Sequence, residues 1–240
     1  MSPRRIRFAL VLLAAVLLAP LARAADAVTD ALQAAYEPYR AALFRTNAGS
    51  AIESQRALAA AREAWQQVRE RFAGSAPAPY DRDRDFGATL AAVDAVYGRA
   101  AGDVQQGRLA AAHETLEEVR DLLAELRRRN GVVTFSDHVN AYHAQMEKVL
   151  QAGAAQLAAG PAGLIELGFE AGALDHLAAQ LRAQAGAALL GDAAFVAALD
   201  AVQSSSARLR AALRASDVEA VRKSLGELKP PFSRLFLRFG

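Results

Sequence analysis

Apolar residues along the chain recur every three or four positions, which is the spacing of one face of an α-helix. In the segment 58–72 they fall at positions such as Leu58, Trp65 and Phe72, with charged residues between them. Seven further segments repeat this pattern, namely 28–43, 86–104, 109–126, 139–157, 167–181, 195–213 and 218–228. We therefore expect an all-α protein of about eight helices. Pro38 is expected to kink or interrupt the first of them.

The breaks between these segments carry turn signals. They include Asn130-Gly131 and Gly160-Pro161. Ser50 with Glu53, and Ser216 with Glu219, fit capping boxes at helix starts, and 74–85 is the one long loop. Short connections place successive helices antiparallel, so we expect two antiparallel four-helix bundles joined near 130–134. The alternative is an extended right-handed helical array.

The sequence also contains an internal repeat with an offset of 109 residues. The matching pairs are Phe86 and Phe195, Leu90 and Leu199, Val93 and Val202, Arg99 and Arg208, and Leu116 and Leu225. Gly107 falls opposite Ser216, and both lie at the expected tight turn. The segments 85–126 and 194–235 are therefore interpreted as duplicated helical hairpins, with 28–72 as a weaker third copy. The expected domains are an N-terminal bundle, 25–131, and a C-terminal bundle, 132–240.

The first residues have the pattern of a secretory signal peptide. Three arginines at positions 4, 5 and 7 precede an apolar run over 8–19, and Ala22-Arg23-Ala24 follows as a cleavage site. We expect residues 1–24 to be removed and the mature protein to begin at Ala25 in the periplasm. An uncleaved N-terminal anchor is the alternative, although the run is shorter than the roughly 20 residues that span a bilayer.

Charge and cysteine content exclude several classes of function. The chain has 28 Lys and Arg residues against 26 Asp and Glu residues. Four of the arginines lie in 1–24, which leaves 24 basic residues against 26 acidic ones in the mature chain. A net charge near −2 gives no electrostatic reason to expect nucleic-acid binding. The absence of cysteine excludes disulfides, thiolate catalysis, cysteine-bound zinc and covalent c-type haem.

Candidate chemistry is concentrated in the segment DHVNAYHAQMEKVL, 137–150. His143 and Glu147 are four residues apart, so they share one helix face. Met146 lies at the centre of the apolar stripe and is expected in the core. Glu117 and Arg120, on the preceding helix, are at the level of His143 if the two helices pair. We therefore expect a polar network of these residues at a helix interface, with Met146 packed beside it.

A metal or haem site is the alternative interpretation of the same stretch. His113 precedes Glu117 by four residues, as His143 precedes Glu147, and the site would consist of His143, Glu147, His113 and Met146. With cysteine absent, a transition metal would be held by imidazole and carboxylate, and a non-covalent haem b is the other cofactor of this alternative. The first interpretation requires no cofactor. His138 and His176 are expected to be exposed.

The C-terminal segment is a short amphipathic helix after a Pro-Pro pair. Its apolar residues are Phe232, Leu235, Phe236 and Phe239. We expect this tail to close the second bundle, with contact to a membrane surface or partner through 232–239 as the alternative.

No catalytic motif with a nucleophile and base can be recognised in the sequence. We expect an exported, periplasmic, non-enzymatic helical-bundle protein that binds or scaffolds a partner protein. The alternative is a periplasmic protein that handles a metal or haem through His143 and Glu147, with Met146 or His113.

Overall fold

A computed structural model describes residues 26–240. These residues are 85% helical and contain ten α-helices, one short 3-10 helix and no strand, which confirms the expected all-α fold. The expected signal peptide lies outside the described residues.

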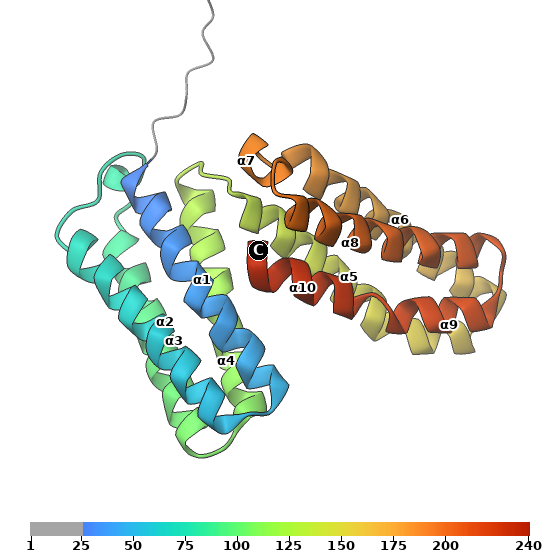
Figure 1. The fold of residues 1–240 in the computed structure, drawn as a ribbon, viewed down its shortest axis with the longest axis horizontal. Helices are drawn as coiled ribbons and strands as arrows, with labels where there is room; N and C mark the ends of the chain where they lie inside the picture. The colour runs from blue at the N-terminus through green and yellow to red at the C-terminus, as the bar shows by residue number, and fades with distance from the viewer. Residues whose placement is uncertain (1–25) are drawn as a thin grey trace, which may run out of the picture.

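The first bundle consists of four long helices, on the left of Figure 1: α1 (Ala27–Ala48), α2 (Ala51–Phe72), α3 (Phe86–Gln105) and α4 (Leu109–Arg129). The predicted stripes face inward and form one core that includes Trp65, Tyr97 and Leu116. The Trp65 indole N–H donates to the Leu90 carbonyl oxygen at 3.3 Å, so the ring is hydrogen-bonded as well as buried.

Helix α1 runs through Pro38, so the expected interruption at this residue is wrong. Proline removes the hydrogen bond to the carbonyl four residues earlier, here that of Ala34. Ala34 is exposed to solvent, where water can replace the missing donor. On the opposite side of the helix, Tyr36 and Tyr39 are buried and hold α1 against the core.

The segment between α2 and α3 is fastened to the first bundle. It contains the 3-10 helix η1 (Tyr80–Arg82), and the hydroxyl groups of Tyr80 and Thr29 are 2.9 Å apart. Asp83 forms an ion pair with Arg129 at 2.9 Å. The second half of this segment is therefore part of the folded structure.

The second bundle lies on the right of Figure 1 and has its own core. Its elements are α5 (Phe135–Ala158), α6 (Pro161–Gln184), α7 (Ala187–Leu190), α8 (Ala193–Arg214), α9 (Val218–Gly226) and α10 (Lys229–Phe239). Helices α9 and α10 together take the place of a fourth long helix. The described residues thus have two hydrophobic cores, the first ending at Val132 and the second beginning at Val139.

The C-terminal tail forms α10 and closes the second bundle. Phe232 and Leu235 belong to the second core, and Phe236 and Phe239 are partly buried against it. Its apolar face is therefore largely used inside the protein.

Two turns related by the 109-residue offset have the same backbone conformation. Gly107 and Ser216 both have positive φ, 73° and 51°. In each turn the backbone N–H of this residue donates to the carbonyl oxygen three residues earlier. The N–H of the following residue donates to the carbonyl oxygen five residues before it, and all four distances are 2.9–3.1 Å. Ser216 therefore ends α8, and Asp217 is the N-cap of α9, so the expected Ser216 capping box is wrong. The duplication itself stays a prediction.

Ser50 does cap α2, but the Glu53 side chain pairs with Arg45.

Buried polar contacts join the two bundles. Arg127, on α4, is 1% exposed and donates two bonds from Nε to the Asp137 carboxylate on α5, at 2.9 and 3.0 Å. Arg40, on α1, donates to the carbonyl oxygens of Leu237 and Arg238 at the end of α10, both at 3.3 Å. Within residues 26–240, no helix is apolar over enough of its length to cross a membrane.

Candidate functional site

The residues predicted to bind a metal all line one cavity between the bundles, which we call the inter-bundle cavity. It has a volume of about 440 Å³ and is bounded by α1, α4, α5 and α10. His113, His143, Met146 and Glu147 are among its lining residues. Tertiary packing therefore brings these candidate residues of α4 and α5 to one cavity.

His143 is held between the two bundles. Its Nδ1 is 3.1 Å from Nη1 of Arg120, and because a guanidinium can only donate, Nδ1 is the acceptor. The ring proton is then on Nε2, which faces the Glu147 carboxylate at 3.5 Å. The imidazole also stacks on Phe232, with parallel rings 4.9 Å apart. Burial, and then the positive charge of Arg120, lower the pKa of His143, so the ring is neutral at pH 7.

The expected polar network is present. Arg120 lies 3.6 Å from Glu117 on its own helix and is bonded to His143, which in turn faces Glu147. The structure adds Lys229, whose Nζ is 3.0 Å from Glu147 Oε1. No local signal marked Lys229, because it comes from α10, far along the chain.

His113 has a different hydrogen-bonding pattern from His143. Its Nδ1 is 2.9 Å from the carbonyl oxygen of Leu43, so Nδ1 is the donor and Nε2 keeps a lone pair. The Nε2 atom is 3.8 Å from Glu117 Oε1. The Nε2 lone pair of His113 could bind a cation, whereas the lone pair of His143 is occupied by Arg120.

The cavity falls short of a complete metal site. Met146 is fully buried in the second core, as its place in the stripe predicted. Among residues 26–240, no three His, Asp or Glu side chains are grouped so that they could hold a metal ion. A metal at Nε2 of His143 would require its proton on Nδ1, where the Arg120 guanidinium now donates.

The remaining histidines lie elsewhere. His176 is exposed on α6, as expected, whereas His138 is only half-exposed in the first turn of α5. The N-cap of α5 is Thr134, which forms a capping box with Asp137.

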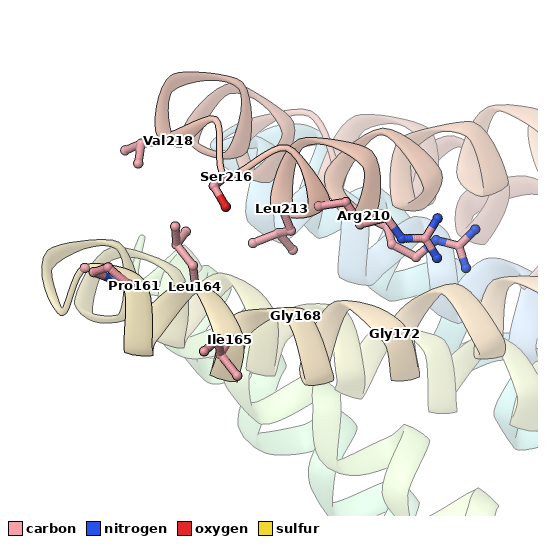
Figure 2. Close-up of a pocket in the computed structure, with 11 residues that line it drawn as sticks. Pro161, Leu164, Ile165, Gly168, Gly172, Arg210, Leu213, Ser216 and Val218 are labelled. Atoms are coloured by element: carbon pink, nitrogen blue, oxygen red, sulfur yellow. The ribbon is translucent and has the colours of Figure 1, made fainter.

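A second candidate site is a groove at the far end of the second bundle, shown in Figure 2, which we call the apolar groove. It has a volume of about 810 Å³ and lies between the start of α6 and the turn from α8 to α9. Its walls include Leu164, Leu213 and Val218, and the half-buried positions Gly168 and Gly172 lie along α6.

Helix α6 is apolar on two sides. One side buries Leu167, Ala171 and Leu174 in the second core. The other carries Ile165 and Phe169, which are 61% and 70% exposed. The sequence contained a signal for this second side, because residues 164, 165, 168, 169 and 172 also follow helical spacing.

Within residues 26–240, the only charged residues that line the apolar groove are two arginines. Arg210 forms an ion pair with Asp175 on α6 at 2.5 Å. Arg214 forms no ion pair with any residue in 26–240. The groove therefore combines apolar walls with an unpaired positive charge.

Comparison with known proteins identifies no relative: no protein family, curated protein or solved structure matches this chain.

Proposed function

We propose that this chain is an exported, non-enzymatic helical-bundle protein that binds a partner protein through the second bundle. The observation that carries this proposal is the exposed apolar side of α6, with Ile165 and Phe169 open to solvent. Large apolar patches that are exposed on a protein surface mark interaction sites. A partner that covers this side would bury it.

The first bundle provides an internal comparison for this surface. At an offset of 109 residues, the four positions Leu164, Ile165, Phe169 and Gly172 correspond to Gln55, Arg56, Ala60 and Glu63 on α2. All four of the α2 residues are exposed, and three of them are polar or charged. A solvent-facing helix at this position thus does not require apolar side chains, which supports a binding role for those of α6.

The proposal that the protein is not an enzyme is supported by the surroundings of its imidazoles. The hydroxyl of Thr46 is 3.4 Å from Nδ1 of His113. Thr46 is 2% exposed, and its hydroxyl lies 2.9 Å from the carbonyl oxygen of Leu43 and 3.1 Å from that of Ala42. A buried hydroxyl that donates to its own helix is poorly placed to attack a substrate.

Export to the periplasm rests on the N-terminal sequence pattern. Cell fractionation and N-terminal sequencing of the native protein test it, with Ala25 as the expected first residue. Protein that retains Met1 and remains in the cytosol would contradict this part of the proposal.

Site-specific photo-crosslinking in the native cell tests the partner-binding role. A photoreactive phenylalanine analogue replaces Phe169 in one variant and Ala60, its counterpart on α2, in the control. We expect one dominant adduct from position 169 and none from position 60. Adding Ile165→Arg, which copies Arg56, should abolish that adduct and leave the thermal midpoint of the protein unchanged.

Equal labelling from both positions, or an adduct that survives Ile165→Arg, would count against the proposal. The first result would mean that the α6 surface is no more occupied than an ordinary solvent-facing helix. The second would mean that the apolar side chains contribute nothing to the contact.

Metal or haem handling is a second candidate function. One observation favours it: His113, His143, Met146 and Glu147 line the same cavity, and His113 has an available lone pair. Calorimetric titration with Cu(II), Zn(II), Fe(II) and haem tests it. Micromolar binding that disappears in His113→Ala would support this function, and the absence of binding would remove it.

A further inference from the structure

We infer that the partner segment that docks in the apolar groove is an amphipathic α-helix with acidic residues beside its apolar stripe. This inference rests on the proposed function and adds the chemistry of the partner. It follows from the shape of the groove, from the apolar surface that continues outside it, and from its charge.

The shape of the groove suits a helix. Along α6 it extends from Gly160 to Gly172. Twelve residues of helix rise by about 18 Å, which matches roughly three turns of a second helix laid beside it. At Gly168 and Gly172, apart from the chain neighbours and the nearby backbone of α6 itself, no atom of residues 26–240 lies within 4 Å of the position where a side chain would begin. The backbone of a ligand can therefore approach α6 closely, while Leu164 and Leu213 offer contacts to its apolar side chains.

The apolar surface is wider than the groove. Ile165 lines the groove and is 61% exposed, and Phe169, which is outside its lining, is 70% exposed. A single acyl chain is usually enclosed by its site, with most of its surface buried. An open groove that continues into an exposed apolar stripe is better covered by a polypeptide with several side chains.

The charge of the groove favours an acidic partner. Arg210 and Arg214 line it, and no acidic residue in 26–240 does. Their counterparts on α3 at the 109-residue offset are Ala101 and Gln105, which carry no charge. The two arginines are therefore a feature of the groove and not of the hairpin as such. Because Arg214 has no ion-pair partner in 26–240, a carboxylate on the ligand could pair with it.

Selection of peptides against the full mature chain tests the inference. A displayed library of helical peptides with random flanks is enriched on wild-type protein and counter-selected on Ile165→Arg. We expect the enriched peptides to have apolar residues at positions i, i+3, i+4 and i+7, flanked by Asp or Glu. Their Kd should rise by about tenfold with Arg214→Glu, as for loss of an interfacial charge pair.

A charge exchange makes the test specific. Replacing the facing peptide Glu by Lys should restore binding to Arg214→Glu and weaken binding to wild type. The matched control is Gln105→Glu, at the corresponding position of the first bundle, which should leave every Kd unchanged. Arg210 is left intact because its ion pair with Asp175 joins α8 to α6.

Several outcomes would overturn the inference. They are enrichment of basic or non-helical peptides, affinities that do not respond to Arg214→Glu, and tighter binding to anionic lipid vesicles than to any peptide. Sedimentation that shows a dimer broken by Ile165→Arg would make a second copy the occupant. If the Phe169 crosslink is lost with Ile165→Arg but unchanged by Arg214→Glu, the proposed function stands and only this inference fails.

Discussion

The two bundles use the same helical positions for different surfaces. A cavity between α2 and α3 of about 320 Å³ is lined by residues that include Gln55, Arg62 and Gln105. The corresponding place in the second bundle is the apolar groove, which is about 810 Å³. Both bundles keep an apolar core stripe, with Leu58 and Leu167 as one matched pair. The stripe is required for folding, whereas the outer side of the helix is free to differ, so function is more readily found there.

The hairpins also differ where their helices meet. In the first bundle Ser54 is buried, and its hydroxyl donates to the Ser50 carbonyl oxygen at 2.6 Å. At the same offset the second bundle has Gly163, where a Cβ atom would lie 1.9 Å from the Gln156 backbone oxygen. Helices α5 and α6 thus approach more closely than a side chain at this position allows.

The largest expected effects on the free energy of unfolding are at Met146, in the second core, and at His143, which lines the inter-bundle cavity. Met146→Ala should destabilise the protein by about 2–5 kcal/mol, because a fully buried side chain leaves a cavity. His143→Ala should cost less, about 1–3 kcal/mol, since it chiefly leaves Arg120 without its acceptor. Urea unfolding followed by circular dichroism measures both. A loss at His143 equal to or larger than the loss at Met146 would contradict this expected order.

A substitution at the helix crossing tests the difference between the hairpins. Gly163→Ala should cost about 3 kcal/mol, because the backbone of Gln156 must move to admit a methyl group. Ser54→Ala in the first bundle should cost about 1 kcal/mol, the contribution of one hydrogen bond. The same unfolding measurement compares them, and similar values would contradict the closer approach of α5 and α6.

The two left-handed turns allow a reciprocal exchange. Ser216→Gly should stabilise the protein by up to about 1 kcal/mol, because glycine adopts a positive φ without steric cost. Gly107→Ser should destabilise it by a similar amount. Thermal midpoints of the two variants provide the measurement. Shifts in the same direction would mean that the two turns are not conformationally equivalent.

The smallest effect is a loss of stability as pH falls below about 6.5. The unfolded chain binds a proton at His143 near pH 6.5, but the folded chain does so only at lower pH because its pKa is lowered. Stability should therefore decline as pH falls below about 6.5, until folded His143 is protonated as well.

Two histidine variants separate this contribution from others. His143→Gln should flatten the decline below about pH 6.5, and His176→Gln, at an exposed position, should leave it unchanged. A further loss at lower pH is expected from Asp137. Burial alone would raise the pKa of Asp137, but bonds from Arg127 and Thr134 lower it below its usual value. An unchanged profile in His143→Gln would refute the buried neutral imidazole.

The sequence by itself determined the features that depend on local spacing. The helical stripes, the burial of Met146 and the equivalent turns at Gly107 and Ser216 all follow from residues close together along one helix or hairpin. The pairing of Arg120 with His143 was also accessible, because the helices that carry them are joined by a short turn. In such cases the helical period alone fixes which side chains share a face.

Only the tertiary structure decided which distant helices meet. It placed Lys229 and Phe232 beside His143, carried α1 through Pro38, and assigned the cap of α9 to Asp217. It also left the outer apolar side of α6 uncovered, although the residues that form this side were visible in the sequence. The helical period determines the faces of each helix, but which face is covered depends on the positions of the other helices, and these are set by packing across the whole bundle.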